Sequence, residues 1–263
     1  MGLATQQVNV AGFDFCIAVG DLTNDRLVFC AGLSMALLTS RKLNRFDYEI
    51  QAFQDTYPEF KLPVHLLPGN HDINDVASLE QFSQDYNVSD HHAFTHLGYR
   101  FILLDSVTLI TNLPEFENYT TAEWNWFENQ LKAAAHAHEQ IIIAHHHLPF
   151  EVTEDEPDSY WNFPTRVRGK YLDLIRQYNV HHILVGHRHE TFNIQPADKA
   201  FTIYVVAGTA RFFDNNGFGI NYFSITGEDS ATDVSQEYVH LEGVTHMKRS
   251  EGLPNGCPDI FAH

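Results

Sequence analysis

The chain has 263 residues, of which 44% are apolar, and this is enough for one large domain with a substantial core. Acidic residues outnumber basic ones by 34 to 16, and the resulting net charge of −18 argues against a nucleic-acid or anionic-membrane partner. No apolar run reaches the length of a membrane span, residues 1–20 lack the pattern of a secretory signal, and the three cysteines show no disulfide-frame spacing. We therefore expect a cytoplasmic protein with free thiols, one domain over residues 13–245, and loose termini at 1–12 and 246–263.

Apolar strands alternate with helical patterns along the chain, and this alternation predicts an α/β fold. Helices are expected where aliphatic and aromatic residues recur at helical spacing. The expected strands are residues 13–19, 64–67, 94–96, 100–106, 140–144, 180–185, 201–207, 219–226 and 235–241, the last three forming a closing antiparallel sheet. The expected helices are residues 28–38, 45–57, 78–86, 121–131 and a segment through 171–175.

Residue types that bind metal ions follow four of these strands. The four stretches are Gly20-Asp21, Pro68-Gly69-Asn70-His71-Asp72, His145-His146-His147-Leu148-Pro149 and Gly186-His187-Arg188-His189. Parallel strands of one sheet end at a common edge, where α/β folds place their ligands. Asp and Asn offer oxygen atoms and His offers nitrogen, and such a set without thiolates suits Mn, Fe or Zn. Taken singly, each stretch is also compatible with an ordinary turn.

The histidine triplet leaves more than one ligand open. Side chains alternate along a strand, so His146 points to the opposite face from His145 and His147, and at most one or two of the three can reach one metal. Two further features favour plainer roles. Asp105 at the end of its strand is expected to be structural, and the basic run at 166–170 is expected to be a charged helix face more than an anion site.

The four stretches, in this order, resemble the motifs of the calcineurin-like metallophosphoesterase superfamily. The resemblance covers roughly residues 13–240 and is greatest to the small branch containing the calcineurin-like phosphoesterase domain-containing protein phosphatase. It implies a double β-sheet sandwich flanked by helices (αββα), with two divalent metal ions at the strand ends. It also implies hydrolysis of phosphomonoesters, with phosphoproteins as one kind of substrate, by attack of a hydroxide that bridges the metals.

Roles carried over from the family are as follows. Asp21 would bridge both metals, with Asn70, His147 and His187 completing one site and His189 serving the other. Asn70 and His71 would contact the phosphate, and His71 would protonate the leaving oxygen. Asp72 would orient His71. His147 is preferred to the runner-up His146 because the third family motif usually reads His-x-Pro, which His147-Leu148-Pro149 matches.

One family motif has no match in the sequence. The family normally begins with a strand that ends in Asp-x-His, and those two residues complete the site shared by Asp21 and His189. The resemblance therefore implies a chain that lacks this first strand, with only one metal site fully liganded. Two alternatives stay open beside the phosphatase: a phosphodiesterase acting on cyclic nucleotides or glycerophosphodiesters, and a catalytically disarmed binding module of the same fold. The oligomeric state does not follow from the sequence.

Overall fold

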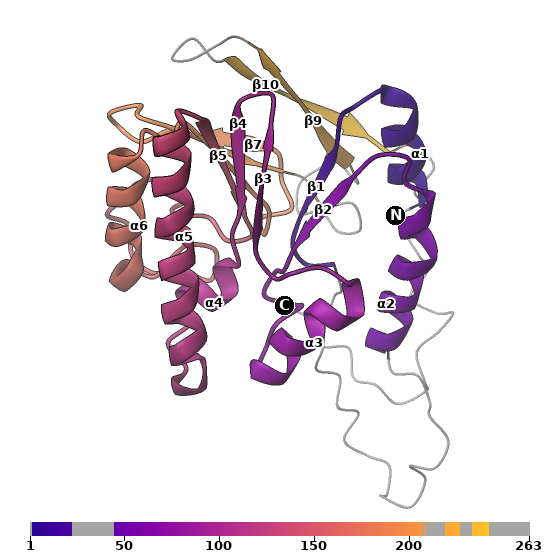
Figure 1. Ribbon diagram of the computed structural model, residues 1–263, viewed down its shortest axis with the longest axis horizontal. Helices are drawn as coiled ribbons and strands as arrows, with labels where there is room; N and C mark the ends of the chain where they lie inside the picture. The colour runs from indigo at the N-terminus through magenta and orange to yellow at the C-terminus, as the bar shows by residue number, and fades with distance from the viewer. Residues whose placement is uncertain (1, 23–44, 207, 209–218, 227–232, 242–263) are drawn as a thin grey trace, which may run out of the picture.

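A computed structural model describes residues 2–22, 45–206, 208, 219–226 and 233–241 of the chain (Figure 1). Its helices are α1 (Gly2–Ala11), α2 (Arg45–Thr56), α3 (Val76–Tyr86), α4 (Ser106–Ile110), α5 (Glu117–Ala137) and α6 (Thr165–Gln177). Short 3-10 turns occur at η2 (Tyr57–Glu59) and η3 (Pro114–Phe116). The strands are β1 (Cys16–Val19), β2 (Val64–Leu67), β3 (His92–His96), β4 (Tyr99–Leu103), β5 (Gln140–His145), β6 (His182–Val185), β7 (Phe192–Ile194), β8 (Thr202–Val205), β9 (Gly219–Thr226) and β10 (Asp233–His240).

A six-stranded sheet of order β3-β4-β5-β6-β8-β7 forms one layer. Strands β4, β5, β6 and β8 run parallel, and the edge strands β3 and β7 pair antiparallel to their neighbours. Helices α5 and α6 cover one face, where Phe127 and Tyr171 are completely buried against Ile143 of β5 (Figure 1). Because each such side chain leaves water, its burial contributes about 1.5–3 kcal/mol, and the helices stay fixed on the sheet.

The opposite face of this sheet packs on two strand pairs. The parallel pair β1–β2 and the antiparallel pair β9–β10 meet β4, β5, β6 and β8 in a shared apolar core that contains Leu67, Leu103 and Tyr204. Helices α2 and α3 cover the outer side of β1–β2, where Phe53 and Phe82 pack on Leu66. The layers therefore follow the order helix, sheet, sheet, helix, which confirms the expected αββα sandwich.

Two elements differ from expectation. Strand β8 belongs to the six-stranded sheet beside β6 instead of the closing antiparallel pair; its Ile203, Tyr204 and Val205 are buried, as is typical of an inner parallel strand. The stretch expected as a loose N-terminus forms α1. Val8 of this helix is buried, and the Asn9 side chain donates to the Glu59 carbonyl and accepts from the Lys61 N–H.

Several expectations lie outside the described residues, namely the helix over 28–38 and the loose terminus at 246–263. Among the residues that the structure does describe, a helix and not an Asp-x-His strand precedes β1, and β1 pairs only with β2. No helix in the described part of the chain is long and apolar enough to cross a membrane. The domain limits at 13 and 245 stay a prediction.

Candidate metal centre

The parallel pairing of β1 with β2 brings the first two stretches together. Val19 is in register with Leu67, so the two strands end side by side and deliver Asp21 and Asn70 to one edge. This approach depends on two glycines. A Cβ on Gly20 would lie 2.5 Å from Nδ1 of His146, and a Cβ on Gly69 would overlap the Asp21 carboxylate. Glycine is therefore the residue that lets the two loops and the carboxylate meet.

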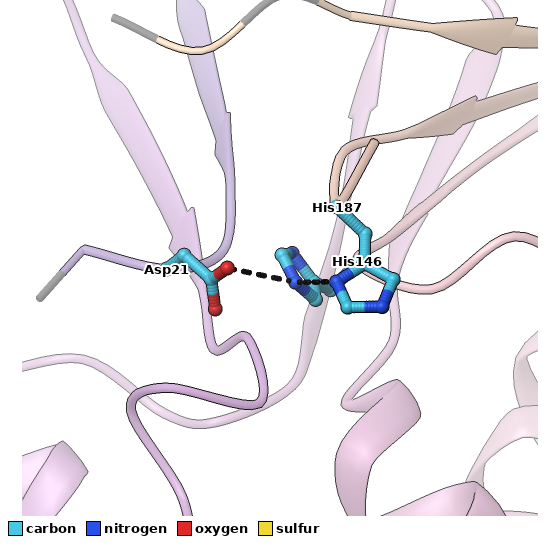
Figure 2. Close-up of side chains that lie close together, drawn as sticks. All are labelled: Asp21, His146 and His187. Atoms are coloured by element: carbon cyan, nitrogen blue, oxygen red, sulfur yellow. Dashed lines mark hydrogen bonds and ion pairs between the residues drawn. The ribbon is translucent and has the colours of Figure 1, made fainter. Parts of the chain in front are cut away.

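Strands β5 and β6 supply the nitrogen atoms from the neighbouring layer. His146 Nε2 lies 3.2 Å from Asp21 Oδ2, 3.1 Å from Asn70 Oδ1 and 3.1 Å from His187 Nδ1. Figure 2 shows Asp21, His146 and His187 pointing toward one another. Ligand atoms of Asp21, His146 and His187 all lie within 4.8 Å of one another, and both imidazoles are almost completely buried.

Backbone carbonyls fix the outer nitrogen of both imidazoles. His146 Nδ1 lies 2.7 Å from the Val19 carbonyl, and His187 Nε2 lies 2.9 Å from the Tyr160 carbonyl. A carbonyl only accepts, so each outer nitrogen donates, and the lone pairs of the inner nitrogens point into the centre. Asn70 Nδ2 likewise donates to the Tyr160 hydroxyl at 2.9 Å and leaves Oδ1 facing inward. This is how outer contacts orient metal ligands.

The donor set fits a divalent metal ion. Bonds of about 2.0–2.1 Å at octahedral or tetrahedral angles place neighbouring ligand atoms about 2.9–3.4 Å apart. The three distances from His146 Nε2 fall within that range. Asp21 Oδ2 is buried and faces His146 Nε2 across 3.2 Å. Oxygen and imidazole nitrogen without thiolate suit Mn, Fe or Zn.

In the absence of a metal, a proton balances part of the charge at this centre. Burial opposes ionisation of Asp21, yet the neighbouring His146 and His71 hold the pKa of this carboxyl below its usual value. Burial likewise opposes a charged His146, but Asp21 raises the pKa of His146 above its usual value. For His187, burial and the nearby His146 lower the pKa to about 3. His187 is therefore neutral and able to bind a metal ion.

The backbone is strained at three of the predicted ligands. Asp21, His187 and His189 have φ angles of 52°, 65° and 57°, in the left-handed region that non-glycine residues seldom adopt. Such conformations cost about 1–3 kcal/mol each and concentrate at functional sites. The surrounding hydrogen bonds of the centre offset this cost.

In the structure, His146 takes the position that the family motif assigned to His147. Side chains alternate at the end of β5, so His145 points to the helix side and reaches the Tyr171 hydroxyl at 2.7 Å. His146 points to the opposite layer, toward β1. The chain turns after β5, and the His147 ring lies with Nδ1 2.9 Å from Ser106 Oγ. The distances favour His146 over His147 as the ligand, and the metal role of either ring stays a prediction.

Three other predicted site residues lie around the centre. The His71 N–H donates to Asp21 Oδ1 at 3.0 Å, so the backbone of His71 lies in contact with the Asp21 carboxylate. Asp72 is completely buried, and its Oδ2 accepts the N–H groups of Gly69 and Leu22, which ties the two loops together. His189 lies outside the close group of ligand atoms. Its metal role, like the roles of His71 and Asp72 toward a substrate, stays a prediction.

The loop after β5 holds the Tyr160 carbonyl in place. The Glu156 carboxylate accepts the N–H groups of residues 151, 152 and 153 and a bond from Asn162 Nδ2. Trp161 lies between the Arg188 guanidinium, 4.8 Å from the ring centroid, and the His187 ring at 5.0 Å. This loop thus contacts His187 through the Tyr160 carbonyl and the Trp161 ring.

A pocket of about 460 Å³ opens beside the centre. Asn70 and His147 line its inner end, and Tyr160, Asn162 and Arg166 line its sides. Arg166 also donates to the Ile110 carbonyl and faces the pocket, whereas Arg168 is buried and donates to loop carbonyls. The basic run therefore does not form one charged helix face. Sequence analysis did not assign the Val19 carbonyl, Ser106 or the Tyr160 carbonyl to the centre, because backbone acceptors have no sequence signal.

Comparison with known proteins identifies the fold and the family. The sequence profile of the calcineurin-like phosphoesterases matches residues 4–191. The chain belongs to this family. Calcineurin-like phosphoesterases normally hold two divalent metal ions, in agreement with the candidate ligands found here.

Relatives within the family carry different activities in their names. Human serine/threonine-protein phosphatase CPPED1 is 28% identical over 133 residues, which are 49% of this chain and 42% of the relative. The 3',5'-cyclic adenosine monophosphate phosphodiesterase CpdA of Escherichia coli is 24% identical over 184 residues, 69% of this chain and 56% of the relative. The chain thus spans about half the length of these relatives. A dimetal phosphatase from Danio rerio shares the fold, with a TM-score of 0.57 and 13% identity over 78% of this chain and 76% of that one.

Proposed function

We propose that the chain is a metal-dependent phosphoesterase that hydrolyses phosphomonoesters, with phosphoproteins among its possible substrates. The observation that carries the proposal is the convergence of Asp21, Asn70 and His187 on His146 Nε2 at 3.1–3.2 Å. Four buried electron-pair donors this close together repel each other unless a proton or a metal cation lies between them. Membership of the calcineurin-like phosphoesterase family suggests phosphoester hydrolysis as the reaction of that cation.

The ligand residues divide between two cation positions in this proposal. Asp21, Asn70, His146 and His187 would hold the first ion, and Asp21 with His189 would hold the second. When bound, divalent cations supply positive charge to the phosphoryl oxygens and acidify the attacking water. The second position has fewer ligands in this chain, so we expect it to bind its ion more weakly than the first.

The chain's own residues position the substrate and handle the leaving group. The His71 N–H donates to Asp21 Oδ1, which keeps His71 beside the carboxylate that would bridge the metals. In this proposal the His71 imidazole gives a proton to the leaving oxygen. Asp72 keeps the loop of His71 attached to the loop of Asp21. The pocket beside Asn70 receives the leaving group, and the Arg166 guanidinium on its side attracts anionic substituents.

A phosphodiesterase is the second candidate, supported by the resemblance to CpdA, which extends over 69% of this chain. A diester needs room for two substituents at the phosphorus atom, whereas a monoester presents one. The pocket of about 460 Å³ beside Asn70 offers room for such a substituent.

The test compares p-nitrophenyl phosphate with bis-p-nitrophenyl phosphate at saturating Mn²⁺, using the wild type, Asn70→Ala and the control Asn129→Ala. Asn129 is exposed on α5, so its loss should change neither metal content nor rate. We expect the monoester to be turned over faster and the Asn70→Ala rate to fall more than about 100-fold, because losing a ligand costs more than losing an outer-shell contact.

A faster diester rate would replace the proposal with the phosphodiesterase. Full metal content without turnover of either compound would support the binding module instead.

A further inference from the structure

A second group of metal-type side chains lies apart from the candidate metal centre. Asp90 and His91 precede β3, and Glu123 lies in α5. His91 Nδ1 is 2.7 Å from Glu123 Oε2 and 3.4 Å from Asp90 Oδ2. One ligand atom from each residue lies within 4.8 Å of the others. These three residues, together with Asp105, are called the acid cluster below.

Asp105 adds a buried carboxylate to this group. The Asp105 N–H donates to Glu123 Oε1 at 3.0 Å, and Asp105 Oδ1 accepts the N–H groups of Val107 and Thr108 at the start of α4. Oδ2 of Asp105 is completely buried and has no hydrogen-bond partner in the part of the chain that the structure describes. A buried oxygen without a partner is unfavourable, and a bound cation or proton would remove that cost.

The charges of the acid cluster do not balance. It contains three carboxyl groups and a single imidazole, and Glu123 has only 1% of its side chain exposed. Burial and the nearby Glu123 raise the pKa of Asp105 well above its usual value, and burial also raises the pKa of Glu123. Burial opposes a charged His91, yet its bonds to Asp90 and Glu123 raise the pKa of His91 to about 10. Even a protonated His91 leaves the cluster with excess negative charge.

We propose that Asp90, His91 and Glu123 bind one divalent metal ion such as Zn²⁺ or Mn²⁺, with Asp105 behind them. One imidazole and carboxylate oxygens are ligands that these ions accept. The ion enters from the surface, because Asp90 and His91 have 22% and 26% of their side chains exposed. This site differs from the candidate metal centre in every ligand, and it does not depend on the proposed phosphoesterase activity.

The site would join three elements of the fold. Asp90 and His91 lie just before β3, Asp105 lies just after β4, and Glu123 lies in the first half of α5. His91 also stacks on the Trp126 ring, with 4.3 Å between ring centroids. An ion shared by these residues would stabilise the packing of α5 on this edge of the sheet, because a ligand that binds only the folded state raises its stability.

The test removes the candidate metal centre first, with the double variant Asn70→Ala/His187→Ala of the full chain. After treatment with a chelator and gel filtration, this variant is incubated with Zn²⁺, and metal content and thermal unfolding are measured. We expect one Zn²⁺ per chain and a Tm increase of roughly 5 °C at Zn²⁺ 100-fold above Kd.

Adding Glu123→Gln should abolish both effects, since the amide keeps the shape but not the charge of the ligand. The matched control is Glu139→Gln, which removes a carboxylate paired with Arg100 elsewhere and should leave Zn²⁺ binding unchanged. Asp90→Asn is a second probe nearer the surface, with an expected loss of at least tenfold in affinity. The proposal is overturned if the double variant retains no Zn²⁺, or if Zn²⁺ binding survives both Glu123→Gln and Asp90→Asn.

Discussion

The candidate metal centre and the acid cluster place histidine among acidic and amide groups in two different ways. At the centre, the outer nitrogens of His146 and His187 donate to the carbonyls of Val19 and Tyr160, so the inner nitrogens carry free lone pairs. In the acid cluster, Nδ1 of His91 faces both carboxylates. The same residue type is thus prepared for a metal in one place and for a proton in the other.

The two sites differ because backbone acceptors decide what a buried histidine binds. A carbonyl behind the ring fixes which nitrogen faces it, so the nitrogen that would bind the metal already points into the centre. In the acid cluster a metal must replace a proton that Asp90 and Glu123 hold firmly, with the pKa of His91 raised to about 10. We therefore expect the centre to bind divalent ions more tightly than the acid cluster at neutral pH.

Replacing each of the two neighbouring histidines with alanine should have the largest effect on metal affinity at the centre. His146→Ala removes the atom on which the other ligands converge, so we expect a loss of more than about 100-fold in metal affinity at the centre, greater than typical outer-shell losses. His147→Ala should change that affinity less than about tenfold, because His147 contacts Ser106 instead. Calorimetric titration with Mn²⁺ measures both. The comparison fails if His147→Ala is the more damaging change.

A glycine substitution should affect the candidate metal centre and leave the acid cluster unchanged. Gly69→Ala would push a methyl group into the Asp21 carboxylate, so we expect about 10–100-fold weaker Mn²⁺ binding at the centre and about 1–3 kcal/mol lower stability. Metal binding at the acid cluster should be unchanged.

The matched control for Gly69→Ala is Gly169→Ala. Gly169 lies within α6, where a Cβ would meet nothing within 4 Å, and alanine there should stabilise the protein by up to about 1 kcal/mol. Equal stability losses in the two variants, measured by urea unfolding, would contradict the crowding argument.

Acid should weaken metal binding at the centre in a graded way. Asp21 raises the pKa of His146, so the metal-free protein keeps a proton on this ring below that pKa, and the metal must displace it. We expect affinity to fall about tenfold per pH unit below the pKa of His146 and to level off above it. Calorimetry in buffers of different ionisation enthalpy should detect release of close to one proton. Buffer-independent heats below pH 7 would contradict this assignment.

Much of the fold follows from patterns in the sequence. Strands β1 and β2, each followed by glycine and a polar ligand, were expected as neighbours, and their parallel register confirms this. The helices around Phe53 and Phe127 also match their apolar spacing. Helix α1 was not expected from the sequence, although half of its residues are apolar, and its position depends on distant contacts such as Asn9 with residues 59 and 61.

The ligand atoms could be predicted from the sequence only to the level of the motif. Asp21, Asn70 and His187 follow strands whose ends are visible as apolar runs, and the structure brings all three together. The choice between His146 and His147 depends on how the chain turns after β5, and the sequence pattern Leu148-Pro149 does not determine that turn. Acceptors such as the Tyr160 carbonyl depend on a loop whose bracing is visible only in three dimensions.

The braced loop also has a consequence for time scales. His187 donates to the Tyr160 carbonyl, and the four bonds made to Glu156 brace the loop that carries Tyr160. An ion held by a buried ring leaves when its surroundings open, so the dwell time of the metal would follow the opening rate of this loop. A change at Glu156, ten residues along the chain from His146, would then shorten residence of the ion more than it weakens the equilibrium affinity.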